Sequence, residues 1–67
     1  MADLTKQQFI EAVRDRLQER GLSQAMRHAI RAVGEFEQDE GVKFGDPNYG
    51  WDRDAAIGFA DEWIIGD

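Results

Sequence analysis

The chain has 67 residues, no cysteine and a formal net charge of −6 at pH 7. This length allows one small domain spanning residues 1–67, and the absence of cysteine excludes disulfides and zinc–thiolate sites as supports for its core. The N-terminus lacks the basic flank and apolar run of a signal peptide, and no apolar stretch approaches the ~20 residues of a membrane span. We therefore expect a soluble, cytoplasmic protein.

The first helix is predicted at about residues 6–20. Thr5 followed by Gln8 matches a capping box, in which each residue satisfies a backbone amide of the other. Gly21 stands where a left-handed residue commonly ends a helix. The apolar stripe that this helix would bury comprises Phe9, Ile10, Val13 and Leu17.

The second helix is predicted at about residues 24–37, with Ser23 as its N-cap. At 100° per residue its apolar side chains fill one arc, which contains Ala25, Met26, Ala29, Ile30, Ala32, Val33 and Phe36. The polar residues Arg27, His28, Arg31 and Glu35 lie opposite. Because Glu37 falls inside the apolar arc, we expect the helix to fray near it, and Gly41 ends the helix at the latest.

Residues 41–51 form the irregular region of the chain. Asp46 to Tyr49 matches a type I turn, with Pro47 at its second position. A short hairpin that pairs residues 42–44 with residues 49–51 is the alternative to an irregular loop, although an isolated strand pair is marginal unless it packs on a helix.

The third helix is predicted at about residues 53–65, with Asp52 as its N-cap and Asp54 in its first turn. Its apolar arc is broader than one neighbouring helix usually covers, so part of it is expected to contact a partner or a second copy. This arc contains Ala56, Ile57, Phe59, Ala60, Trp63 and Ile64. Together the elements predict an all-α domain of three helices, with an irregular or hairpin-like insertion before the third.

The charges are divided unevenly between the two halves of the chain. Residues 1–33 carry six basic and four acidic side chains, a balance of +2, whereas residues 34–67 carry two basic and ten acidic ones, a balance of −8. Such a field repels the phosphates of nucleic acids and attracts basic protein surfaces. A charge-rich surface is also a common route to solubility.

Two local patterns suggest other functions but fail on neighbouring residues. Residues 19–24 are similar to the segment that joins the first two helices of repressor-type helix-turn-helix domains, but residues 35–40, which would read DNA, carry four carboxylates. Oxygen-bearing side chains alternate over residues 46–54 as in a calcium loop. Trp51 stands where an EF-hand requires glycine, and Ile57 stands where it requires glutamate. Neither direct nucleic-acid binding nor a metal site is expected.

Catalysis has little support in the sequence. His28 is the single histidine, and no nucleophile is evident as its partner. A chain of this length also has little material to shape a water-excluding pocket of several hundred Å³. We therefore expect a protein that is not an enzyme and that uses no cofactor.

The sequence predicts an acidic protein-binding module that docks its C-terminal half on a basic, nucleic-acid-handling surface of a partner protein. Small phage and mobile-element inhibitors, such as anti-CRISPR and anti-restriction proteins, mimic nucleic acid in this way, and size and charge are the basis of the analogy. The alternative is a homo-oligomerising or accessory subunit, for example a homodimer, that uses the apolar face of the third helix. The candidate partner-binding residues are Glu35, Asp39, Glu40, Tyr49, Asp54, Asp61, Glu62 and Trp63.

Overall fold

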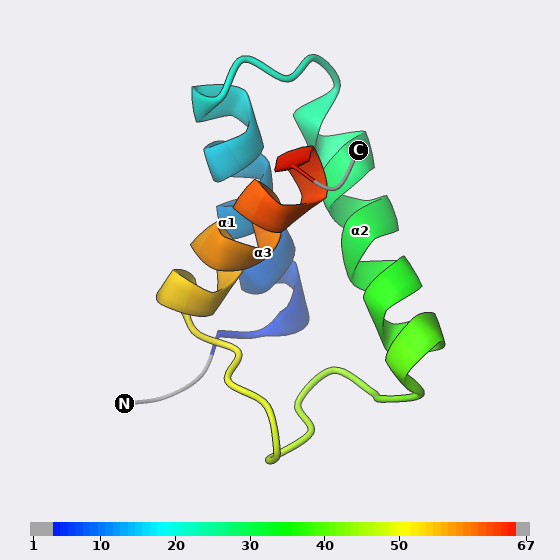
Figure 1. The fold of residues 1–67 in the computed structure, drawn as a ribbon. Helices are drawn as coiled ribbons and strands as arrows, with labels where there is room; N and C mark the ends of the chain where they lie inside the picture. Colours follow the sequence, from blue (N-terminus) through cyan, green and yellow to red (C-terminus); the bar gives the residue numbers. More distant parts are fainter. Residues whose placement is uncertain (1–3, 66–67) are drawn as a thin grey trace.

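The computed structural model describes residues 4–65, and three helices follow one another in this part of the chain (Figure 1). They are α1 (Lys6–Glu19), α2 (Ala25–Glu40) and α3 (Arg53–Ile65). Both α2 and α3 pack on α1, so the predicted all-α fold is confirmed. The connection between α2 and α3 contains turns and no strand in the described residues, so the hairpin stays unconfirmed.

The capping box and the glycine stop of α1 are both present. The Thr5 hydroxyl accepts a hydrogen bond from the Gln8 amide at 3.1 Å, and the Gln8 side chain accepts one from the Thr5 amide at 2.9 Å. At the other end Gly21 has a φ of +86°, and the Leu22 amide donates to the Leu17 carbonyl at 3.0 Å. This 6→1 bond is that of a Schellman motif, which satisfies carbonyls that the last helical turn leaves free.

The start of α2 differs from the prediction, because Gln24 and not Ser23 occupies the N-cap position. Gln24 lies in the left-handed region, with φ 56° and ψ 42°, and its side chain forms no capping hydrogen bond. Five residues, 20–24, reverse the chain between α1 and α2. We attribute the left-handed Gln24 to this short reversal, which turns the backbone again after Gly21 and leaves Ser23 exposed.

The end of α2 also differs, because the helix runs three residues past its predicted end and stops at Gly41, whose φ is +66°. The expected fraying is absent because Glu37 has two partners. Its carboxylate accepts hydrogen bonds from the Lys6 ammonium at 2.8 Å and from the Phe44 amide at 2.9 Å. A polar side chain on an apolar arc is tolerated when its hydrogen bonds are made.

The burial of two residues of α2 differs from what the helical wheel predicted. Ile30, a member of the predicted apolar arc, is 55% exposed and lines an open hollow together with Ile10 of α1. His28, predicted on the outer side, is half-buried, because α3 lies beside it and the Trp63 indole donates to His28 Nδ1 at 3.3 Å. The residues of α2 that do enter the core are Ala25, Ala29, Ala32 and Val33.

Trp51 connects the irregular segment to the core and is only 3% exposed. Its ring centre lies 5.5 Å from that of Phe9 on α1 and 4.4 Å from that of Phe44 in its own segment. Its indole N–H donates to the Asp46 carbonyl at 3.0 Å, and its carbonyl accepts from the Leu4 amide at 2.9 Å. A segment without regular structure is thereby held by one buried aromatic residue.

The N-cap predicted for α3 is confirmed, since the Asp52 carboxylate accepts a hydrogen bond from the Ala55 amide at 2.8 Å. The residues of α3 that are fully buried are small, namely Ala56 and Ala60, which lets the helix approach α1 closely. Within residues 4–65 no helix has both the length and the apolar run required to cross a membrane.

Candidate functional site

An open groove of about 210 Å³ lies between α2 and α3. Aromatic side chains form its floor, where the rings of Phe36 and Phe59 meet edge to face at 5.4 Å. Carboxylates stand on both of its sides. The residues that line this docking groove are Ala32, Glu35, Phe36 and Asp39 from α2, and Phe59, Glu62 and Trp63 from α3.

Helical spacing explains why acidic and aromatic side chains meet in the docking groove. On α2 its lining residues recur every three or four positions from Ala32 to Asp39, so they share one face of the helix. On α3 the interval from Phe59 to Trp63 is one turn, and Glu62 lies between them on the same side. Two carboxylates therefore stand beside Phe36 on α2, and one stands beside Phe59 and Trp63 on α3.

Two of the three carboxylates of the docking groove have no cation beside them. Asp39 and Glu62 are exposed, and neither takes part in an ion pair among residues 4–65. Glu35 accepts a hydrogen bond from Arg31, one turn away on α2, at 2.6 Å. The docking groove thus presents uncompensated negative charge next to apolar rings.

Asp61, one of the candidate partner-binding residues, is paired with a basic residue of α1. Its two carboxylate oxygens accept hydrogen bonds from the Arg16 guanidinium at 2.9 and 3.2 Å, which joins α3 to α1. This hydrogen bonding lowers the pKa of Asp61 below its ordinary value and raises the pKa of Arg16. Asp61 therefore has a structural role, because its partly exposed carboxylate is held by a residue of the neighbouring helix.

The remaining candidate residues lie around the docking groove or away from it. Trp63 lines the groove, and Tyr49, 37% exposed, packs edge-on against Phe36 at a ring distance of 5.8 Å. Glu40 is the last residue of α2, and Asp54 lies in the first turn of α3; both are exposed and neither lines the groove. In Figure 1 α3 begins away from α2 and approaches it only near its end.

Phe36 and Phe59 form the floor of the docking groove, although neither is among the candidate partner-binding residues predicted above. Both were assigned to apolar stripes, and their spacing from neighbouring carboxylates was readable in the sequence. What was missing is where α2 and α3 come together, which follows from how both helices pack on α1. No local pattern specifies that arrangement.

Two of the oxygen-bearing residues of the calcium-like pattern, Asp46 and Asp52, have backbone partners. The Asp46 carboxylate accepts a hydrogen bond from the Asn48 amide at 2.9 Å and so forms an Asx turn. The Asp52 carboxylate is used as the cap of α3. Among residues 4–65 no three histidine, cysteine or acidic side chains gather as the ligands of a metal ion would.

Comparison with models of known protein families, with curated proteins and with solved structures finds no match for this chain. No relative therefore supplies a function that could be transferred to it. The features that can support a functional proposal are the docking groove, its unpaired carboxylates and the uneven distribution of charge along the chain.

Proposed function

We propose that this protein is a non-enzymatic binding module. Its docking groove between α2 and α3 receives basic side chains of a partner protein. The observation that carries this proposal is the pairing of an aromatic floor with the unpaired carboxylates Asp39 and Glu62 on opposite sides. The wider acidic half of the chain, with its balance of −8, supplies a long-range field of the same sign.

The docking groove suits an arginine side chain particularly well. A guanidinium is planar, stacks on aromatic faces and donates hydrogen bonds to carboxylates, and it is more weakly hydrated than an ammonium. Trp63 offers such an aromatic surface beside Glu62, and Asp39 stands across the groove. Surfaces that normally bind nucleic acid are rich in arginine and lysine, so they are the class of partner surface that we propose.

Occupation of such a surface would exclude nucleic acid from it, so the proposed biological role is that of an inhibitor or modulator. Phage and mobile-element proteins directed against CRISPR or restriction systems are analogous in size and charge. The proposal places the protein in the cytoplasm with its partner, where nucleic acid competes with it for the same basic surface.

The alternative role is that of an accessory or homo-oligomeric subunit that uses the apolar face of α3. Fewer observations support it. Trp63 and Ile64 are half-buried and pack against the core, and the strongly exposed apolar residue of α3 is Ile65 at its end. Ionic strength distinguishes the two roles, because electrostatic docking weakens steeply with added salt whereas apolar assembly does not.

A matched pair of double variants tests the proposal. Asp39→Asn with Glu62→Gln removes two charges from the docking groove, and Asp15→Asn with Glu19→Gln removes two from the exposed surface of α1. Partners captured from host lysate on the immobilised wild-type protein are eluted by a salt gradient and identified, and association rates of all forms with the recovered partner are then measured.

The groove variant should associate about tenfold more slowly at low salt, because electrostatic steering changes association rates by this order, and the α1 variant should resemble the wild type. Both variants should melt close to the wild type, since exposed charges contribute little to stability. Competition by DNA or RNA should release the partner. Full affinity of the groove variant throughout a salt titration would contradict the proposal.

A further inference from the structure

A second, apolar hollow lies between α1 and α2, on a different side of α2 from the docking groove. Its volume is about 520 Å³, and its apolar walls are Ile10 of α1 with Met26 and Ile30 of α2. Ile30 is 55% exposed, and together with the half-buried Ile10 and Met26 it forms one apolar face. The polar residues at its edge are Lys6, Gln7 and Glu11.

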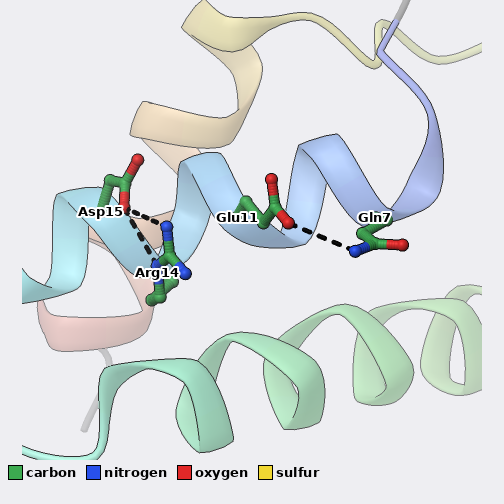
Figure 2. Close-up of polar contacts among 4 residues, drawn as sticks. All are labelled: Gln7, Glu11, Arg14 and Asp15. Carbon is green, nitrogen blue, oxygen red and sulfur yellow. Dashed lines mark hydrogen bonds and ion pairs between the residues drawn. The ribbon is translucent and has the colours of Figure 1, made fainter.

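The polar residues along this face are paired within the chain. Figure 2 shows Gln7 donating to Glu11 at 3.3 Å and Arg14 pairing with Asp15 at 2.7 Å along α1, with α2 beside it. Lys6 is paired with Glu37. At the edge of the hollow the charge of Lys6 is therefore compensated, whereas Glu11 accepts a hydrogen bond from a neutral amide and keeps its negative charge.

A ridge of three residues follows this face of α2, with a large side chain at one end and a glycine at the other. Met26, Ile30 and Gly34 are spaced by four residues, so they follow one another along the helix surface. Gly34 is exposed, and a Cβ atom placed on it would meet no atom within 4 Å. Ile30 thus stands between a bulky side chain and an open position.

We propose that this face binds a second copy of the chain, with the two α2 helices antiparallel about a two-fold axis near Ile30. In this register Ile30 meets Ile30 of the other copy, and each Met26 covers Gly34 of the other copy. The ridge is therefore complementary to itself, as the interface of a two-fold dimer must be. Each Met26 fills space that the missing side chain of Gly34 leaves open.

The charge distribution opposes self-association less at this face than at the acidic half of the chain. Two chains of net charge −6 repel each other, and most strongly through their acidic halves. The central residue of the proposed contact belongs to the half with a balance of +2, and Lys6 at the edge of the hollow is paired with Glu37. The docking groove lies on another side of α2, so each copy in the dimer keeps its own groove free, and the dimer can engage two basic sites at once.

Single-cysteine variants test the contact directly, because the chain has no cysteine of its own. A disulfide requires Cα atoms within about 4.4–6.8 Å of each other, so Ile30→Cys should cross-link into a covalent dimer under mild oxidation. Ile65→Cys, at a position that is 77% exposed on α3, is the control and should stay mainly monomeric. Equal cross-linking of both variants, or none at position 30, would overturn the proposal.

A second variant separates assembly from folding. Gly34→Gln has room on the free chain and improves helix propensity, but it places a side chain where Met26 of the other copy should lie. Sedimentation in the micromolar range should show a dimer for the wild type and a monomer for Gly34→Gln, with the same helical circular dichroism. A monomeric wild type, or a Gly34→Gln variant that remains dimeric, contradicts the interface.

Discussion

Glu37 is an acidic residue on the apolar side of α2, and its position is explained by two hydrogen bonds. The Lys6 ammonium on α1 and the Phe44 amide beyond α2 both donate to its carboxylate. The hydrogen bond from Lys6, with that from Phe44, lowers the pKa of Glu37 below its ordinary value of 4.5, although partial burial opposes this. One charged side chain thereby links α1, α2 and the following segment.

The lowered pKa of Glu37 predicts a stability that depends on pH. Because the folded state binds this proton more weakly than the unfolded state, the stabilisation is present above about pH 4.5 and is lost as the pH falls through the folded-state pKa. Glu37→Gln should melt below the wild type at neutral pH and lose less on acidification. Melting temperatures measured at intervals from neutral pH to about pH 3 check this expectation.

The control for this prediction is Glu35→Gln, which removes an exposed ion pair between residues one turn apart on the same helix. Such pairs contribute little, so this variant should follow the wild-type dependence on pH more closely. Melting curves of Glu37→Gln that stay parallel to those of the wild type at every pH would show that the carboxylate of Glu37 does not stabilise the fold.

Among the elements, α2 has the least favourable start. Gln24 adopts a left-handed conformation that costs L-residues roughly 1–2 kcal/mol, and its side chain supplies no cap in return. The helix also begins with the basic residues Arg27 and His28 near its positive end. The strain lies within the five-residue connection that sets the approach of α2 to α1.

Gln24→Gly should therefore stabilise the protein. Glycine adopts positive φ without a steric penalty, and after its greater flexibility in the unfolded chain is taken into account the gain should be about 0.5–1 kcal/mol. For a domain of this size such a gain raises the melting temperature by several degrees. Gln24→Ala keeps the Cβ atom and is the control without a gain; equal melting of the two variants would exclude strain at this position.

The elements show which features the sequence could predict. The caps at Thr5 and Asp52 and the glycine stop at Gly21 depend on neighbours within a few residues, and all three are present. Ser23 and Ile30 were misplaced because their environments depend on the path of the connection and on which sides of α2 the other helices cover. Residues close in the sequence determine the capping hydrogen bonds, whereas contacts between distant parts of the chain determine how the helices are oriented.

The docking groove illustrates the same distinction at the level of the site. The acidic half of the chain was evident from composition, and Glu35, Asp39 and Glu62 were among the candidates that the structure brings together. Asp61 was a candidate because it is a carboxylate of the acidic half, and its pairing with Arg16 on α1 could not be foreseen. A sequence shows which carboxylates exist, but the packing of α2 and α3 on α1 decides which of them remain free.

At the scale of the whole molecule, burial of the Trp51 ring accounts for a large part of the stability of the core. The four largest fully buried side chains all belong to α1 or α2, and Trp51 brings the irregular segment onto them. A domain of 67 residues has a free energy of unfolding of roughly 3–10 kcal/mol. The loss of one large buried ring, at about 3–5 kcal/mol, is therefore comparable with the stability of the entire fold.

Trp51→Ala should leave much of the protein unfolded at room temperature, which circular dichroism and dispersion of the amide signals in NMR spectra would reveal. Tyr49→Ala, in the same segment but 37% exposed, is the matched control and should remain folded with a modestly lower melting temperature. A folded Trp51→Ala variant would mean that the helices hold together without the irregular segment.

The central position of α1 has a consequence for the order in which the molecule assembles. Contacts between α1 and α2 close a short connection, whereas those between α1 and α3 join distant parts of the chain and require a longer loop to close. We expect the α1–α2 pair to form first and α3 to dock on it afterwards. The face proposed for a second copy is then complete before the docking groove exists, so only the fully folded chain can recognise a basic partner.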